Sequence, residues 1–251
     1  MQLPAPAYLL PLRRDEQPAW QRRTRAPIVL RTVRHGAETL AWRQRAVRVD
    51  VDVYVVGRDE PAVLGAEAET ESLRIELALD DDAGEADFTP ATRSMAGAVG
   101  SAIAAAARER PRARRIVVDG AAAAALRSNL VAEERALRAR ADRIDCAKPA
   151  TREALFRRLL LSADFIQSHF AEPLSVDLLA AVSNLSPFHF ARLFSLVMDE
   201  TPHAFLTRKR VAVARRLIDA GLGHGDAAER AGFGCRSTLF RHLREAAAVR
   251  S

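Results

Sequence analysis

Arginines on short amphipathic helices are the residues of this chain whose type and spacing indicate chemistry. In the segment SPFHFARLFSLVM, residues 186–198, apolar side chains recur at helical spacing from Phe190 to Val197, which leaves Arg192 on the other face. An arginine fork can donate two hydrogen bonds to a guanine edge, and small or flat neighbours let a helix approach the groove. The pattern predicts a recognition helix, although an ordinary helix pair with an incidental arginine explains this single segment equally well. The neighbours on the outer face are Ser186, Phe188 and Ala191.

A first helix and a tight turn are predicted directly before this segment. Ser175 is a good N-cap for the helix SVDLLAAV, because its hydroxyl can accept a hydrogen bond from an unpaired amide. Asn184 tolerates a left-handed backbone, and Ser186 with Pro187 forms the cap and first position of the next helix. The two segments together predict a helix-turn-helix unit.

A second unit of the same kind follows. A long helix is expected from the cap Thr201 towards Ala220, and then a helix from Asp226 in DAAERAGF and another in CRSTLFRHLREA. Two such units joined by one rigid helix can enter successive major-groove segments about 34 Å apart. The outward residues of the last helix are Arg236, Ser237, Phe240 and Arg241.

From about residue 151 to residue 244 the chain resembles the DNA-binding domain of AraC/XylS-type transcriptional regulators. The resemblance runs through TREALFRRLLLSADFIQSHFAEPLSVDLLA, LSPFHFARLF, TPHAFLTRKRVAVARRLI and AGF. It implies an all-α domain of about seven helices, with both outer faces named above directed at bases. Arg210 matches an arginine of the family's linker helix, for which a structural salt bridge and a phosphate contact are both open.

The second unit departs from the family pattern more than the first. Ala227 and Ala231 replace branched aliphatic residues, His224 replaces an apolar residue, and Gly234 replaces a serine cap. In the first unit, Asp199 replaces a glycine, a change that should cost little. The family's terminal Gly, Pro and aromatic-Arg segment is also missing before the sequence ends. The second unit is therefore expected to be the softer one and to act mainly as a phosphate clamp.

Strand patterns predict a β-rich N-terminal region. Strands are expected at 28–34, 39–49, 51–57 and 72–80, and the last alternates clearly between apolar and polar residues. The region resembles the cupin-like β-barrel sensor domain that precedes many AraC-type DNA-binding domains, so the whole chain is expected to be α+β. Trp20, Trp42 and Tyr54 can either line a ligand cavity or fill the core of the barrel.

Two helices are predicted between the strands and the C-terminal domain, within residues 92–110 and 120–145. Lys148 and Pro149 mark the domain boundary, with Thr151 as the expected cap of the next helix. This gives a cupin-like sensor and dimerisation domain over residues 1–148, including the helical segment 92–145, and a DNA-binding domain over 149–251. The resemblance favours a homodimer formed through the N-terminal domain.

The composition fits an intracellular nucleic-acid-binding protein. The net charge is +6, and residues 150–251 contribute +4 of it. The two isolated cysteines suit a reducing cytoplasm, and no stretch approaches the length of a membrane span. Before residue 150, His35 is the only histidine, so we expect no metal, no cofactor and no catalytic residues. The acidic residues Asp50, Asp52, Glu76 and those at 80–82 are interpreted as a solvated surface.

Together these observations predict a sequence-specific DNA-binding transcription regulator that is not an enzyme. Double-stranded DNA is the expected partner, and a small-molecule effector and RNA polymerase are further candidates. One alternative is a degenerate regulator that acts through protein contacts, with weak DNA binding by its second unit. A less favoured alternative is a cupin-type enzyme fused to a DNA-binding domain.

Overall fold

The computed structural model describes residues 28–42, 45–57, 61–77, 88–89 and 91–248. The chain divides into two compact units, Met1–Ala136 and Leu137–Ser251, and the division falls inside helix α2 (Gly120–Asp142). The domain boundary expected after residue 148 coincides instead with the start of α3 (Pro149–His169), and it stays a prediction.

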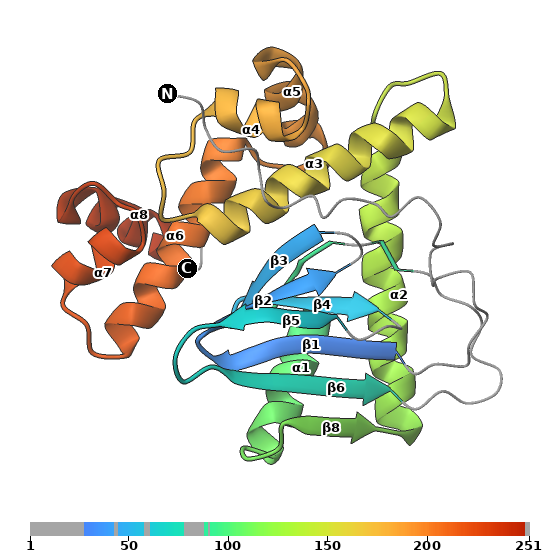
Figure 1. Ribbon diagram of the computed structural model, residues 1–251, viewed down its shortest axis with the longest axis vertical. Helices are drawn as coiled ribbons and strands as arrows, with labels where there is room; N and C mark the ends of the chain where they lie inside the picture. The colour runs from blue at the N-terminus through green and yellow to red at the C-terminus, as the bar shows by residue number, and fades with distance from the viewer. Residues whose placement is uncertain (1–27, 43–44, 58–60, 78–87, 90, 249–251) are drawn as a thin grey trace. The chain divides into compact units, whose positions relative to one another are not determined.

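The N-terminal unit contains two β-sheets (Figure 1). The five-stranded sheet has the order β7-β4-β1-β6-β8, in which only the β6–β8 pair is parallel. The three-stranded sheet has the order β3-β2-β5 and is antiparallel. The strands are β1 (Ile28–His35), β2 (Ala37–Trp42), β3 (Arg45–Asp50), β4 (Val53–Gly57), β5 (Ala62–Ala66), β6 (Glu71–Leu77), β7 (Arg93–Ser94) and β8 (Arg115–Val118).

The predicted closed barrel is wrong, because the described strands form two sheets that do not close on each other. The chain passes from one sheet to the other at Gly36, between β1 and β2, where φ is +71° and a Cβ atom would lie 2.5 Å from Oγ1 of Thr70. The strand expected over 39–49 is in fact the hairpin of β2 and β3. Closure into a barrel requires continuous pairing around the ring, and this corner ends it.

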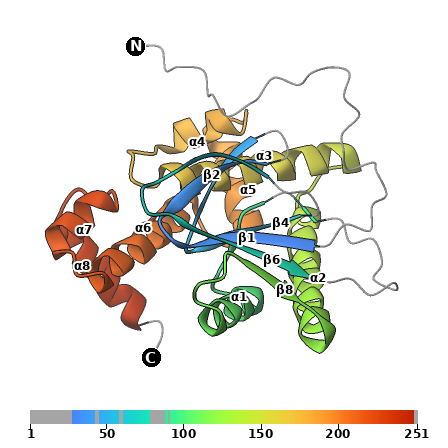
Figure 2. The same cartoon turned by 60° about the horizontal axis from the view of Figure 1, so that its bottom comes forward.

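Two apolar clusters cover the two faces of the five-stranded sheet. On one face the sheet packs against α1 (Ala98–Glu109) and α2, which lie on the same side of it in Figures 1 and 2. On the other face, Val53 and Val55 of β4 join Leu40, Val47 and Val49 of the three-stranded sheet. The five-stranded sheet is therefore the central layer of this unit.

Tyr54 belongs to the apolar core of this unit. Its side chain is fully buried, and its hydroxyl donates a hydrogen bond to Glu133 of α2. Burial, together with this hydrogen bond, raises the pKa of Tyr54 well above its usual range. Trp20 and the side chain of Trp42 lie outside the described residues.

Two acidic residues of this unit, Asp50 and Glu76, are buried, which corrects their interpretation as part of a solvated surface, whereas residues 80–82 lie outside the described residues. Asp50 and Glu76 are only 4% and 6% exposed. Glu76 accepts two hydrogen bonds from Arg115, which hold the pKa of this carboxyl below its usual range. Glu76 therefore forms a paired contact between β6 and the neighbouring strand β8.

The C-terminal unit is all-α. Six described helices, α3 to α8, lie wholly within it, where the resemblance implied about seven. The caps expected at Ser175, Ser186 and Thr201 are confirmed by hydrogen bonds to their side chains. No described helix is both long and apolar enough to cross a membrane. The helices after α3 are α4 (Val176–Val182), α5 (Pro187–Met198), α6 (Pro202–Asp219), α7 (His224–Arg230) and α8 (Arg236–Ala248).

Two helix starts differ from prediction. Helix α3 begins at Pro149 rather than after a cap at Thr151, because proline suits the first position of a helix, where its missing N–H is not needed. Helix α7 begins at His224, with Gly223 at its cap, rather than at Asp226. Both helices are longer at their N-terminal ends than the cap residues alone suggested.

Candidate nucleic-acid interface

The first helix-turn-helix unit is held by local hydrogen bonds that the sequence provides. The Ser175 hydroxyl accepts a hydrogen bond from the amide of Leu178 at 3.1 Å, which caps α4. Asn184 adopts the predicted left-handed conformation with φ of +50°, and Ser186 then caps α5 by accepting from the amide of His189 at 3.4 Å. The cap at Ser175, the backbone of Asn184 and the cap at Ser186 thus define the start of α4, the turn and the start of α5.

Helix α5 has one buried and one exposed face, as predicted. The rings of Phe190 and Phe194 lie 5.3 Å apart, and Phe194 meets Phe205 of α6 edge to face at 5.6 Å. These contacts fix the orientation of α5 against α6. On the opposite face, Phe188 is 82% exposed and Arg192 is exposed.

Two ion pairs and a hydrogen bond secure the C-terminal end of α5. Asp199 takes the left-handed cap position with φ of +58°, which confirms that it replaces a glycine without a break in the fold. Arg143 forms an ion pair with its carboxylate and also donates to the carbonyl of Leu196 at 3.2 Å. Arg140 lies 3.8 Å from the same carboxylate. The cap is therefore tied to the segment that precedes α3.

The second unit repeats this arrangement with smaller side chains. Its turn contains Gly232 with φ of +80°, where a Cβ atom would lie 2.8 Å from the backbone of Ala171. Ala227 and Ala231 are fully buried, where larger aliphatic residues were expected from the resemblance. His224 stacks on the ring of Phe240 at 5.0 Å, so this unusual residue packs against α8.

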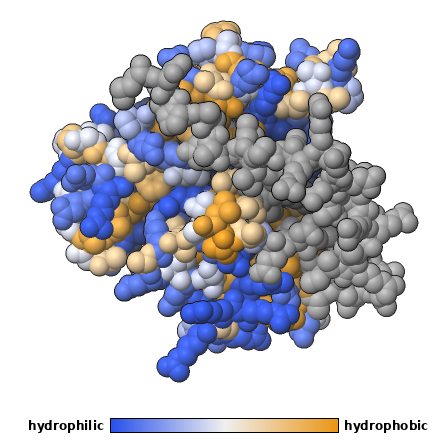
Figure 3. All heavy atoms as spheres, viewed as in Figure 1, coloured by the Kyte–Doolittle hydropathy of each residue, from blue (hydrophilic) through white to orange (hydrophobic). Residues whose placement is uncertain are grey.

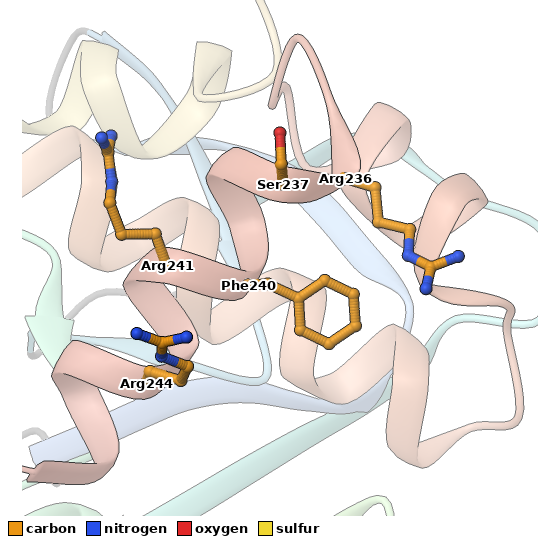
Figure 4. Close-up of a pocket in the computed structure, with 5 residues that line it drawn as sticks. All are labelled: Arg236, Ser237, Phe240, Arg241 and Arg244. Atoms are coloured by element: carbon orange, nitrogen blue, oxygen red, sulfur yellow. The ribbon is translucent and has the colours of Figure 1, made fainter.

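The exposed face of α8 forms a shallow basic depression. It has a volume of about 540 Å³, and Figure 4 shows its side chains arranged along the helix. The guanidinium carbon of Arg236 lies 5.2 Å from the Phe240 ring, which leaves Phe240 half-buried rather than fully outward. The lining residues are Arg236, Ser237, Phe240, Arg241 and Arg244.

The two candidate recognition helices have matching registers. In α5, the amide of Phe190 donates to the carbonyl of Ser186, and in α8 the amide of Leu239 donates to the carbonyl of Cys235. Phe190 and Leu239 are both fully buried. Counted from these starts, Arg192 and Arg241 occupy the same position, and both are exposed.

The comparisons agree with this geometry. Residues 179–250 match the family model of a helix-turn-helix domain. This segment is therefore similar to a helix-turn-helix domain. An uncharacterized HTH-type transcriptional regulator, YbfI of Bacillus subtilis (strain 168), is 28% identical over 76 residues. That match covers 30% of this chain and 28% of the relative, so the chain spans well under two thirds of the relative's length.

A solved structure is also similar to this domain. It is the DNA-binding domain of AdpA, described as the global transcriptional factor, in complex with a target DNA. The sequence identity is 28%, and the match covers 35% of this chain and 80% of that chain, with a TM-score of 0.34.

Arg210 of the helix-turn-helix domain is held by backbone carbonyls. Its guanidinium donates to the carbonyls of Phe170 at 2.6 Å and Glu172 at 2.7 Å, which ties α6 to the end of α3. Burial lowers the pKa of Arg210 from its usual value. The structure thus gives this side chain internal partners, and a phosphate contact by Arg210 stays a prediction.

Two residues of the interface escaped the sequence analysis. Arg244 lies on the same face of α8 as Arg241, three residues later, and helical spacing alone would have indicated it. Cys235 lies at the start of α8, with its sulfur 3.1 Å from the hydroxyl oxygens of Ser237 and Thr238. These contacts lower the pKa of the exposed Cys235 thiol to about 7, a property that only the folded turn reveals.

Proposed function

We propose that this chain is a sequence-specific, DNA-binding transcription regulator. The observation that supports this most is the repetition of one arrangement: a capped helix with its buried face fixed by packing and an exposed arginine at the same register, Arg192 in α5 and Arg241 in α8. The helix-turn-helix match over residues 179–250 covers both helices. An ordinary helix pair would not require an exposed aromatic residue such as Phe188 beside the arginine.

In this proposal, α5 supplies most of the base recognition. The guanidinium of Arg192 would donate two hydrogen bonds to guanine, and Phe188 would contact a thymine methyl group. The half-buried Ala191 leaves room for the helix to enter the groove. The exposed Ser186 lies at the N-terminal end of α5, where phosphates are bound favourably.

Helix α8 would grip the neighbouring major-groove segment, with a larger share of phosphate contacts. Arg236, Arg241 and Arg244 present three positive charges along one depression, and Ser237 adds a hydroxyl. Phe240 is held between His224 and Arg236, which favours it as support for Arg236. Helix α8 would therefore act mainly as a clamp.

The N-terminal unit would modulate this binding. From the resemblance we propose that it senses a small-molecule effector and forms a homodimer, and that the bound regulator acts on RNA polymerase. The described core is filled by side chains such as Tyr54 and Phe88. An effector would therefore bind outside this core.

Selection of bound sequences from random duplex DNA by the full chain tests the proposed function. We expect enrichment of a site with two half-sites about one helical turn apart. A selection that enriches no sequence would contradict the proposal. As a control, the selection is repeated with the Arg208→Ala variant of the protein. Arg208 is an exposed arginine of α6 that pairs with Glu200, so this variant should select the same site as the unmodified chain.

A degenerate regulator that acts mainly through protein contacts is the second candidate, favoured by the small buried residues Ala227 and Ala231. In that case, the selected site would contain only the half-site read by α5. A single half-site in the selection would therefore replace the first proposal with this one.

A further inference from the structure

A strongly basic loop joins α1 to β8 in the N-terminal unit. Residues 108–115 contain five arginines and one glutamate. Arg115 is paired with Glu76, whereas the other four arginines are exposed, and no described residue forms an ion pair with them. The lower edge of the molecule in Figure 3, over this loop, is strongly hydrophilic. The four exposed arginines, here called the arginine loop, are Arg108, Arg110, Arg112 and Arg114.

The backbone of the arginine loop is fixed by a turn and by the half-buried side chain of Arg34 in β1. The amide of Ala113 donates to the carbonyl of Arg110 at 3.1 Å, with Pro111 at the second position of the turn, where proline is favoured. Arg34 donates to the carbonyls of Ala107 at 2.6 Å, Arg110 at 2.7 Å and Ala113 at 3.0 Å. The loop therefore presents its side chains from an ordered backbone, which lowers the entropic cost of binding.

The stability of the fold does not explain this accumulation of charge. Arg108 lies in the last turn of α1, where a cation complements the helix dipole. The remaining three arginines have no such role, and the guanidinium of Arg34 adds a further positive charge beneath them. Like charges that greatly outnumber their counter-charges, here with Glu109 as the one carboxylate of the segment 108–115, raise the local potential and attract polyanions.

We propose that the arginine loop is an additional phosphate-binding surface that contacts the backbone of duplex DNA. Arginine forks match phosphate oxygens, and closely spaced guanidinium groups on an ordered turn suit a repeated phosphate chain. A protein partner is less favoured, because protein interfaces need an apolar or aromatic centre, and the loop offers only Pro111 and the half-buried Ala113. The inference rests on the proposed function, since the ligand is the same DNA.

The salt dependence of DNA binding by the full chain tests this inference. The variant replaces all four arginines of the loop with glutamine and is compared with the unmodified chain on two long duplexes, one with the selected site and one of random sequence. We expect the slope of log K against log salt to decrease in magnitude by roughly 0.9 for each phosphate that the variant no longer neutralises. Affinity should fall by the same factor on both duplexes, because phosphates carry no sequence information.

The controls separate charge from folding. Arg135→Gln removes one exposed arginine from α2, and Arg112→Gln removes one from the tip of the loop. Only Arg112→Gln should change the slope, and circular dichroism should show that both variants fold. An unchanged slope in the fourfold variant would overturn the inference, and so would a loss of affinity confined to the selected site.

The outcome is distinguishable from failure of the proposed function. If selection enriches no sequence, yet the fourfold variant lowers the slope on random DNA, sequence recognition fails while the arginine loop stands. If selection succeeds and the slope does not move, only the inference fails. Competition with polyglutamate adds an arm for an acidic protein partner. Polyglutamate and unlabelled duplex are compared as competitors for the chain bound to random DNA, at equal concentrations of negative charge. If polyglutamate is the stronger competitor, and only when the arginine loop is intact, the DNA assignment is overturned.

Discussion

Two arginines of this domain differ in their surroundings, and the surroundings determine what each guanidinium group is able to bind. Arg192 is exposed on α5, whereas Arg210 is half-buried and bonded to the carbonyls of Phe170 and Glu172. An exposed fork keeps its hydrogen-bonding capacity for a ligand, but a fork bound to carbonyls contributes to the fold. Residue type alone does not separate the two roles.

Arg192→Ala should weaken binding to the selected site by about 1 to 3 kcal/mol, because alanine cannot donate the paired hydrogen bonds to guanine. Binding to random duplex should change little, since one phosphate contact at most is removed. Titration of both duplexes at a single salt concentration measures the difference. Equal losses of affinity on the two duplexes would show that Arg192 reads no base.

Arg210→Gln should lower the free energy of unfolding by about 1 to 3 kcal/mol, because two carbonyl partners lose a charged donor. Arg208→Gln on the same helix removes only a surface ion pair with Glu200 and should cost less than about 1 kcal/mol. Urea unfolding of both variants provides the measurement. If Arg208→Gln lowers the free energy of unfolding more than Arg210→Gln does, the hydrogen bonds of Arg210 to the carbonyls of Phe170 and Glu172 do not stabilise the domain.

The Cys235 thiol should react as a thiolate at neutral pH. With Cys146→Ser, so that one thiol remains, the rate of alkylation should be half-maximal near pH 7, because hydroxyl contacts lower the pKa of Cys235 to about 7. The thiolate is present above this pH and is lost as the pH falls through it. Thr238→Ala should move the midpoint upward, and bound DNA should slow the reaction. A midpoint above pH 8 with Thr238 present would refute the assignment.

At the scale of elements, the two helix-turn-helix units have the same design but different amounts of buried apolar surface. Leu179 and Phe190 fill the first unit, and Ala227 and Leu239 occupy the corresponding places in the second. Hydrophobic stabilisation is about 0.8 kcal/mol for each buried methylene. The second unit should therefore open more readily than the first.

Amide hydrogen exchange tests this difference directly. The buried amides of α7 and α8 should exchange through openings that are roughly 2 kcal/mol easier than those of α4 and α5, in proportion to the missing methylene groups. Bound DNA should slow exchange in α8 more than in α7. Equal protection of both units would mean that the stack of His224 on Phe240 compensates for the small residues.

The sequence predicts the elements of the C-terminal unit better than those of the N-terminal unit, and the reason is physical. Ser175 and Ser186 accept hydrogen bonds from amides three positions away, and Asn184 acts through its own left-handed backbone, so their types define the caps and the turn. The corner at Gly36, by contrast, depends on Thr70, which lies far away in the chain. Strand β5, which pairs with β2, and the open edges of the sheets also depend on such distant partners.

The same distinction applies to the candidate site. The outer faces of α5 and α8 follow from helical period, which is local, so the exposed positions of Arg192, Arg236 and Arg241 agree with prediction. By contrast, Arg210 and Arg34 donate hydrogen bonds to carbonyls that are far away in the chain. Residue spacing along the sequence cannot predict such contacts.

At the scale of the whole molecule, the length of α6 would set how the two proposed recognition helices share one duplex. Its 18 residues span roughly 27 Å, somewhat less than the 34 Å repeat of the major groove. Helix α6 packs against α5 and also against α7 and α8, so one rigid element carries both units. In the proposed function, this arrangement would suit contacts on successive turns of one groove.

The length of DNA that one chain protects is the strongest test of this arrangement. A single chain should protect about two turns of duplex, roughly 20 base pairs, because each unit covers about one turn.

The double variant Arg236→Ala and Arg241→Ala should reduce the protected length to about half, since α8 then lacks two of the three arginines in its depression. Arg192→Ala should instead lower occupancy without shortening the footprint when protein is in excess. Hydroxyl-radical footprinting, with the mass of the complex measured in the same sample, gives both quantities. A footprint of one turn for the unmodified chain would mean that α8 does not engage the duplex and that the first unit binds alone.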